Sequence, residues 1–216
     1  MASIERQKVQ VLSEMAESIR MLTGLENWTQ QTDSGCCMIT SAAWGEGKTV
    51  LTACLGILSA QCHYKRVLII DMNWHKPCLH NCFGLTPEWD LTHYFHETSI
   101  SDFIRSSGSQ NLDILTAPIS SDNGENSSVE NSRTAARILK QSRELYEFIL
   151  VDTAAMFPTN RYMVDPVIIG NACDLVILVA LTSVTPRQQI KRALLMLQST
   201  GIKVAGVVVN HWKDQK

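Results

Sequence analysis

The stretch that decides the fold is Thr40 to Leu51, "TSAAWGEGKTVL". It follows the apolar run "CCMIT" (36–40) and leads into a run of residues that favours a helix. An apolar strand, a glycine-containing turn and a helix form the context in which G-x-x-x-x-G-K-[ST] cradles phosphate groups. The turn keeps the final Gly-Lys-Thr of that pattern, whereas Ala42 replaces its first glycine. A small residue suffices at that position if the backbone angles permit it.

Each part of the turn that matches the pattern has a physical task at a phosphate site. Gly45 and Gly47 let the backbone turn tightly and point its N–H groups at phosphate oxygens, and the helix that starts near Lys48 adds its dipole. Lys48 would neutralise the β- and γ-phosphates, and the Thr49 hydroxyl would bind Mg²⁺. An ordinary glycine-rich strand–helix turn is the alternative. The candidate nucleotide-binding residues of the loop are Ala43, Trp44, Gly45, Glu46, Gly47, Lys48, Thr49 and Val50.

The composition is that of a globular chain with no strong charge bias. The 216 residues are 45% hydrophobic and 19% charged, which suits one domain, or one domain with a small appendage. A net charge of −2 demands neither nucleic acid nor an anionic membrane as a partner. The N-terminus has no signal-peptide core, and the seven cysteines are scattered. We therefore expect a cytoplasmic protein with free, buried thiols.

The apolar runs predict a doubly wound α/β fold with a mostly parallel β-sheet flanked by helices. Most runs are continuous rather than alternating, as in strands that are buried on both faces. The predicted strands are 36–40, 66–71, 112–117, 147–152, 174–181 and 203–210. The predicted crossover helices are Thr49–Gln61, Asn131–Leu145 and Arg187–Thr200. For the last helix we expect Thr185 as N-cap and Pro186 in the first turn.

Two segments depart from this alternation. Residues 1–30 carry Val9, Leu12, Ala16 and Ile19 at helical spacing, which predicts an amphipathic N-terminal helix ahead of a nucleotide-binding domain over 31–216. The segment 120–132, "SSDNGENSSVENS", is polar and predicts an exposed loop.

Two predicted strands end in an aspartate. Asp71 closes "RVLIID" and Asp152 closes "EFILVD". Ligands of open α/β sheets lie beyond the carboxyl ends of the strands, so both carboxylates should share a crevice with the phosphate loop. A helix N-cap or a turn is the alternative for Asp152. We take Lys48, Asp71 and Asp152 as candidate catalytic residues, and Thr49, Asp71 and Asp152 as candidate Mg²⁺ ligands.

Here the chain resembles a known family. "TSAAWGEGKT", "VLIIDMNWHKPCLHNCFGL", "FILVDTAAM" and "GVVVN" look like the phosphate loop, the second acidic motif, the Walker B strand and the terminal asparagine strand of the bacterial tyrosine kinases. These belong to the MinD/ParA/Mrp class of P-loop ATPases. The resemblance runs in order from Glu17 to Asn210. Ala43 stands where ParA and MinD proteins carry their signature lysine, which favours the kinase-like branch.

The resemblance implies ATP or ADP with Mg²⁺ as cofactors. Lys48 would contact phosphates and Thr49 the metal. Asp71 would position or deprotonate the attacking group, Asp152 would hold the metal directly or through water, and Asn210 would contact the adenine edge. It also implies a membrane polysaccharide co-polymerase of the chain-length-determinant type as partner, a place at the inner face of the membrane through that partner, and allows a homo-oligomer.

The chain departs from the family at several positions. Asn73 replaces the second carboxylate of the D-x-D motif, and His75 stands at the usual basic position, followed by Lys76. Thr23 breaks the E-x-x-R-x-x-R pattern of ring assembly that begins at Glu17 and Arg20. No tyrosine cluster follows Asn210. The tyrosines lie apart, at Tyr64, Tyr94, Tyr146 and Tyr162.

Three further features have two interpretations each. Trp44, at a position where the family usually has proline, is either a lid or contact residue or packs on the neighbouring helix. His75, Cys78, His80 and Cys82 are either zinc ligands or residues without a metal, because their spacing fits no standard zinc site and the family fills the His80 position without metal. Arg161 and Arg187 are either phosphate or partner contacts or plain surface residues.

Two hypotheses for the function therefore stand. In the first, the chain is an enzyme that transfers phosphate from ATP to protein tyrosine or hydrolyses ATP weakly, and regulates capsule or exopolysaccharide synthesis. In the second, it is a degenerate, nucleotide-dependent switch or scaffold. Asn73 and the missing tyrosine cluster favour the switch or a weak ATPase.

Overall fold

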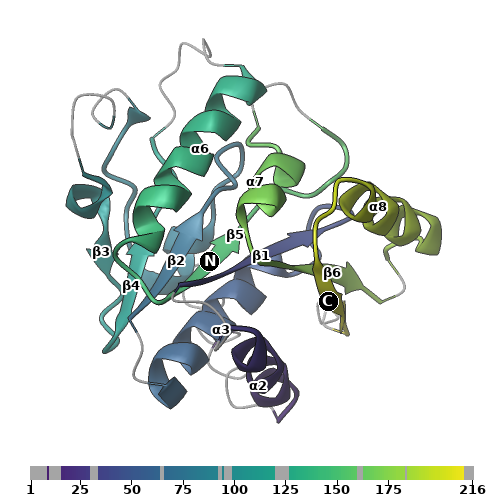
Figure 1. Cartoon of the computed structure of the whole chain (residues 1–216), viewed down its shortest axis with the longest axis horizontal. Helices are drawn as coiled ribbons and strands as arrows, with labels where there is room; N and C mark the ends of the chain where they lie inside the picture. The colour runs from purple at the N-terminus through teal and green to yellow at the C-terminus, as the bar shows by residue number, and fades with distance from the viewer. Residues whose placement is uncertain are drawn as a thin grey trace.

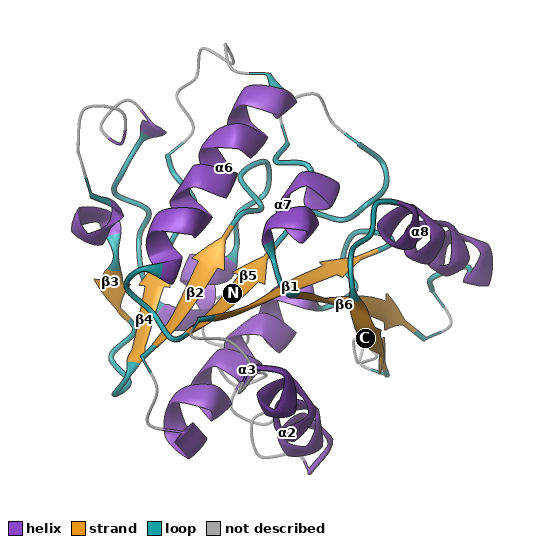
Figure 2. Ribbon diagram, in the orientation of Figure 1, coloured by secondary structure: helices purple, strands orange, loops and turns teal. Residues whose placement is uncertain are grey.

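The computed structural model describes residues 9, 16–29, 34–63, 66–91, 94, 99–119, 127–159, 163–182 and 184–211. Within these residues, a seven-stranded sheet runs in the order β3-β4-β2-β5-β1-β6-β7 (Figure 2). Its strands are β1 Gly35–Ser41, β2 Val67–Asp71, β3 Arg105–Ser106, β4 Leu112–Leu115, β5 Phe148–Asp152, β6 Leu175–Leu181 and β7 Val204–Asn210. Every strand pair is parallel except β3–β4.

Helices cover both faces of the sheet. The elements are α2 Ala16–Thr29, α3 Lys48–His63, α4 Leu79–Phe83, the 3₁₀ turn η1 Ile100–Phe103, α6 Ser128–Arg143, α7 Pro166–Ala172 and α8 Arg187–Ser199. In Figure 1, α6 and α7 lie above the sheet, while α2 and α3 lie below it. The doubly wound α/β prediction is confirmed.

The side chains of the continuous apolar runs form two hydrophobic cores, one on each face of the sheet. In β2, Leu68 and Ile70 belong to the core under α6, α7 and α8, while Val67 and Ile69 belong to the core over α2, α3 and α4. Since successive side chains of a strand point to opposite faces, a strand covered on both sides must be apolar at every position. This is why the strands read as unbroken runs.

The predicted strands and crossover helices are present, with small shifts at their ends, but the predicted cap of α8 is wrong. Pro186 is the N-cap and makes no side-chain capping bond. The Thr185 hydroxyl instead accepts from Leu181 N at 3.0 Å and donates to the Glu46 carboxylate. These two contacts use the hydroxyl that would otherwise cap the helix.

The predicted polar loop over 120–132 is wrong at its second half, and residues 120–126 lie outside the described part. Ser128 begins α6, and Ser127 and Glu130 form a reciprocal capping box. Ser127 Oγ accepts from Glu130 N at 3.3 Å, and Ser127 N donates to Glu130 Oε2 at 2.9 Å. A Ser-x-x-Glu pattern is a helix start signal. The polar residues that predicted a loop therefore include the N-cap of α6.

The N-terminal helix is described from Ala16 to Thr29, and Leu12 lies outside the described residues. Leu22 and Leu25 are buried against the α3 core, whereas Ile19 is 47% exposed, so its predicted place on the buried face is wrong. Ser18, one position before Ile19, is buried instead. None of the helices in the described ranges is long and apolar enough to cross a membrane.

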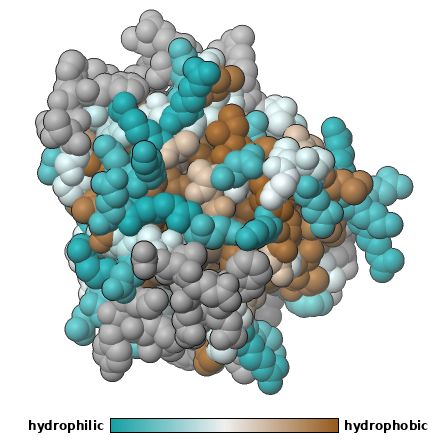
Figure 3. Space-filling model, viewed as in Figure 1, coloured by the Kyte–Doolittle hydropathy of each residue, from teal (hydrophilic) through white to brown (hydrophobic). Residues whose placement is uncertain are grey.

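The surface is not uniform. Figure 3 shows that apolar side chains on the viewed face gather toward the side of α7 and α8. Large exposed apolar residues of α8, β7 and the turn after β6 are Val184, Leu195, Met196, Val207 and Val209.

Candidate nucleotide-binding site

The turn between β1 and α3 has the backbone that a phosphate loop needs. Gly45 and Gly47 have φ angles of 74° and 91°, in the left-handed region where a side chain is strained. Ala42 is fully buried in the core under α6 and α7. The methyl group of Ala42 therefore packs in the protein interior at the position where the general pattern has glycine.

Lys48 opens α3 and is buried beneath the loop. Its Nζ donates to Ser41 Oγ at 2.9 Å, and Ser41 Oγ donates to Ala43 O at 2.5 Å. Burial lowers the pKa of Lys48, and the negative charges of Asp152 and Glu46 partly oppose that shift. A buried amine that is hydrogen-bonded to a neutral hydroxyl and lines the cavity is placed to attract an incoming phosphate group.

The two strand-end carboxylates lie side by side, because β2 and β5 are neighbours and Asp71 pairs in register with Asp152. Asp152 Oδ2 accepts from Thr49 Oγ1 at 2.6 Å. Asp71 Oδ1 accepts from Asn73 N at 3.0 Å, and Oδ2 accepts from Leu79 N at 3.1 Å. The predicted crevice therefore brings Lys48, Thr49, Asp71 and Asp152 together.

The carboxyl groups of Asp71 and Asp152 both have raised pKa values. Burial raises the pKa of Asp71 well above its usual value, and the neighbouring Asp152 raises it further. Burial also raises the pKa of Asp152 to about 6, although Lys48 and the Thr49 hydrogen bond act in the opposite direction. A cation at these strand ends would relieve both effects.

The residues fit a magnesium nucleotide. Within the described residues, Asp152 Oδ1 is buried without a hydrogen-bond partner, next to the Thr49 hydroxyl. Mg²⁺ prefers such hard oxygen ligands and usually completes its sphere with water and phosphate oxygens. A cavity of about 600 Å³ opens beside them. Its lining residues are Trp44, Gly45, Gly47, Lys48, Thr49, Val50, Asn73, Lys76, Pro77, Cys78 and Ala155.

Glu46 and Asn210 brace the loop. The fully buried Glu46 carboxylate accepts from Ala43 N at 2.8 Å and from the Thr185 hydroxyl. Asn210 Nδ2 donates to Glu46 O at 3.0 Å and lies so close to Gly47 that a Cβ there would be 2.4 Å away. Asn210 thus lies at the loop, and its adenine contact stays a prediction.

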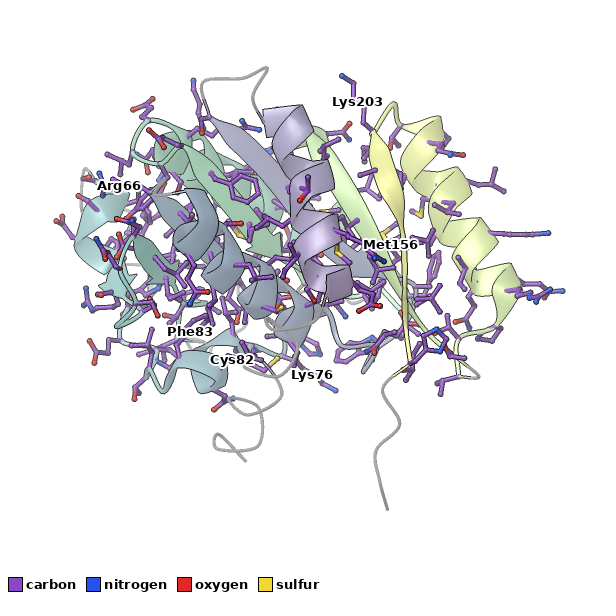
Figure 4. All side chains as sticks on the ribbon, turned by 90° about the horizontal axis from the view of Figure 1, so that it is seen from below. Arg66, Lys76, Cys82, Phe83, Met156 and Lys203 are labelled. Atoms are coloured by element: carbon purple, nitrogen blue, oxygen red, sulfur yellow. The ribbon has the colours of Figure 1, made fainter. Side chains whose placement is uncertain are left out.

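Trp44 lies over the loop that follows β2. Its ring meets His75 edge-on at 5.8 Å between centroids, and Lys76 Nζ lies 4.0 Å from its ring centre. Figure 4 shows Lys76 at the same lower edge of the molecule as Cys82 and Phe83 of α4. Trp44 is therefore a contact residue of the cavity wall. Sequence reasoning did not name Pro77 and Cys78 as wall residues, although they follow closely after Asp71.

Comparisons with known proteins identify the family of the chain. The chain is 30% identical over 206 residues to the tyrosine-protein kinase YwqD of Bacillus subtilis, a match that covers 94% of this chain and 83% of the relative. The chain belongs to the bacterial tyrosine kinase family. It is also 31% identical over 174 residues to the putative tyrosine-protein kinase CapB of Staphylococcus aureus, covering 80% of this chain and 73% of CapB. No protein-family model matches the chain.

Solved structures give the same fold. The chimerical protein CapA2B2 has a TM-score of 0.70 at 25% identity, covering 87% of this chain and 80% of the chimera. The VpsO kinase domain has a TM-score of 0.73 at 24% identity, covering 91% and 97%. MinD of Pyrococcus horikoshii, complexed with Mg-ADP, has a TM-score of 0.69 at 19% identity, covering 85% and 72%. The MinD-like P-loop fold predicted from the sequence is confirmed.

The structure shows where some of the residues that depart from the family's pattern lie. Asn73 Nδ2 donates to Lys76 O at 2.7 Å, so the amide shapes the turn beside the cavity. Tyr94 and Tyr146 are buried: Tyr94 bonds Gln141 at 2.9 Å, and Tyr146 bonds Asp113 at 2.8 Å. Tyr64 and Tyr162 lie outside the described residues.

The other candidate sites look different in three dimensions. Cys82 is buried in the core beside α3, His75 is exposed, and Cys78 turns to the nucleotide cavity. Within the described ranges, no three His, Cys, Asp or Glu side chains gather as a metal site. Arg187 is exposed at the start of α8, and Arg161 lies outside the described residues.

Proposed function

We propose that this chain binds Mg·ATP in the cavity and acts as a weak ATPase or tyrosine autokinase. The observation that carries the proposal is the pair of Thr49 and Asp152, joined at 2.6 Å, with a second Asp152 oxygen left without a partner among the described residues. Asp71 is the neighbour of Asp152 across the strands and the charge of Lys48 acts on Asp152, at the ends of the strands where α/β proteins bind ligands.

The proposed roles follow from position and charge. Mg²⁺, when bound, supplies positive charge to the phosphate oxygens. The backbone N–H groups of the loop and the Lys48 amine would hold the phosphates. Thr49 and Asp152 would hold the metal. Asp71, whose pKa is raised, could accept a proton from an attacking water or hydroxyl group more readily than an ordinary aspartate.

The proposed setting is the bacterial cytoplasm, at the inner face of the membrane beside a polysaccharide co-polymerase, in capsule or exopolysaccharide synthesis. The similarity to the chimerical protein CapA2B2 and to CapB supports it. Self-association is part of the same proposal. On the described α2, Glu17 and Arg20 are exposed and available for contacts between subunits.

A second candidate is a nucleotide-dependent switch that binds ATP without using it. Asn73 favours this function, since its amide replaces a carboxylate and is engaged with Lys76 O. The burial of Tyr94 and Tyr146 also removes these two tyrosines as ready acceptors.

One experiment separates the two functions. The protein is incubated with Mg·ATP, and nucleotide binding, phosphate release and tyrosine phosphorylation are measured for the wild type, Lys48→Met and Asp71→Asn. Lys140→Met, an exposed lysine on α6, is the matched control and should behave as the wild type. Lys48→Met should lose nucleotide binding, and Asp71→Asn should bind nucleotide but lose turnover.

The outcomes are distinct. If ATP binds and neither product forms, the enzyme proposal is wrong and the switch stands. If ATP does not bind, both are wrong. Asn73→Asp then tests whether the missing carboxylate limits turnover, because restoring it should raise phosphate release without a large change in ATP affinity.

A further inference from the structure

Cys78 lies in the nucleotide cavity, apart from the other cysteines and histidines of its segment. It occupies the N-cap position of α4, yet its side chain makes no capping hydrogen bond. Its Sγ lies 3.1 Å from Thr49 Oγ1. The one hydroxyl proton of Thr49 goes to Asp152, so the thiol is the donor in this contact.

A second, independent observation points to a ligand at the same place. Asp152 is fully buried, and its Oδ1 has no hydrogen-bond partner within the described residues. Its Oδ2 contacts the same Thr49 hydroxyl that Cys78 contacts. A sulfur atom and a carboxylate oxygen therefore both contact one hydroxyl oxygen.

The spacing matches that of ligands around one metal ion. Two ligands at right angles, with a metal–oxygen bond of about 2.1 Å and a metal–sulfur bond of about 2.4 Å, stand about 3.2 Å apart. The distance between Cys78 Sγ and Thr49 Oγ1 is 3.1 Å. This separation allows a single ion to bind both the Thr49 oxygen and the Cys78 sulfur.

We propose that Cys78 coordinates the divalent cation of the nucleotide site, and that the site therefore favours ions that bind thiolate better than Mg²⁺ does, Mn²⁺ modestly and Cd²⁺ strongly. This rests on the proposed nucleotide binding. Coordination releases the thiol proton to solvent, and the thiolate replaces one water molecule on the ion. Thiolate ligands select softer ions, whereas Mg²⁺ favours oxygen ligands and retains its water.

The test uses Cd²⁺ as probe, together with ADP. The background variant is Cys173→Ser, which breaks the close thiol pair of Cys36 Sγ and Cys173 Sγ, 3.4 Å apart, a second place where Cd²⁺ could bind. In this background, Cd²⁺ and ADP together should produce the ultraviolet thiolate-to-cadmium absorption band. Adding Cys78→Ser should abolish the part of the band that depends on ADP.

A second measurement gives the preference itself. The ratio of Mn²⁺ to Mg²⁺ affinity in the presence of ADP should fall by about tenfold or more in Cys78→Ser, the size of effect expected for loss of a metal-site contact. If Cys78→Ser keeps both the ADP-dependent band and the affinity ratio, the proposal is overturned, even if its melting temperature falls. If ADP with Mg²⁺ binds to neither protein, the proposed nucleotide binding itself fails.

Discussion

The contact between Gly56 of α3 and Ile69 of β2 sets how closely the phosphate-loop helix can approach the sheet. A Cβ added at Gly56 would lie 2.3 Å from Ile69 Cδ1 and 2.7 Å from Ile69 Cγ1. Both distances are far below van der Waals contact, and Ile69 is fully buried. Gly56→Ala must therefore push α3 away from β2 or force Ile69 into a strained rotamer.

Gly56→Ala has two opposing effects on the free energy of unfolding. Alanine is about 1 kcal/mol better than glycine inside a helix, whereas overpacking a core costs about 1–3 kcal/mol. Gly56→Ala should therefore lower the free energy of unfolding by about 0–2 kcal/mol, or the melting temperature by up to about 8 °C. In an Ile69→Ala background both clashing atoms are gone, so the same change should stabilise by about 1 kcal/mol.

Urea denaturation followed by circular dichroism measures this reversal. Gly24→Ala is the matched control, because Gly24 lies in α2 and a Cβ there has nothing within 4 Å. It should be neutral or stabilising in both backgrounds. If Gly56→Ala stabilises the otherwise wild-type chain as much as Gly24→Ala does, the close approach of α3 to β2 is wrong. A helix displaced by the clash should also weaken ATP binding, since Thr49 would move relative to Asp152.

Three more outcomes follow from the charges and hydrogen bonds. Without nucleotide, the raised pKa of Asp152, about 6, means that the folded state holds its proton more tightly than the unfolded state, whose pKa is about 3.9. The stabilisation of the folded state by this proton is complete below about pH 3.9 and is lost as the pH rises through about 6. Asp152→Asn should therefore remove this fall in stability, which is worth up to about 3 kcal/mol. Melting curves taken across this pH range measure it. Asn210→Ala removes the 3.0 Å hydrogen bond to Glu46 O and should weaken ATP binding about fivefold, as measured by calorimetry. Unchanged affinity would show that this hydrogen bond does not hold the phosphate loop in its binding geometry. Arg143 bridges Ser34 O, Ala172 O and Asp174, so Arg143→Met should cost about 2 kcal/mol in urea denaturation, and Arg143→Lys should recover less than half of it.

Much of the fold could be read from the chain. Continuous apolar runs predict strands covered on both faces, and the two cores of β2 show the reason. The phosphate loop could also be predicted from the sequence, because it depends only on local features. These are two glycines at positive φ, a strand before them and a helix after them. The predictions were wrong where a polar side chain can form more than one kind of hydrogen bond. Ser127 and Glu130 cap α6 in a segment taken for a loop, and the Thr185 hydroxyl bonds Glu46 instead of capping α8.

The sequence by itself determined which residues could bind phosphate and metal, since a lysine after the glycine turn and aspartates at strand ends are chemical requirements. Only the tertiary structure decided which of them meet. The neighbouring positions of β2 and β5 bring Asp71 beside Asp152, and Thr49 reaches Asp152 from 103 residues away. Cys78, which the sequence grouped with histidines as a candidate zinc ligand, meets Thr49 instead. Strand order and side-chain direction fix these contacts, and both depend on how the whole sheet packs rather than on any local pattern.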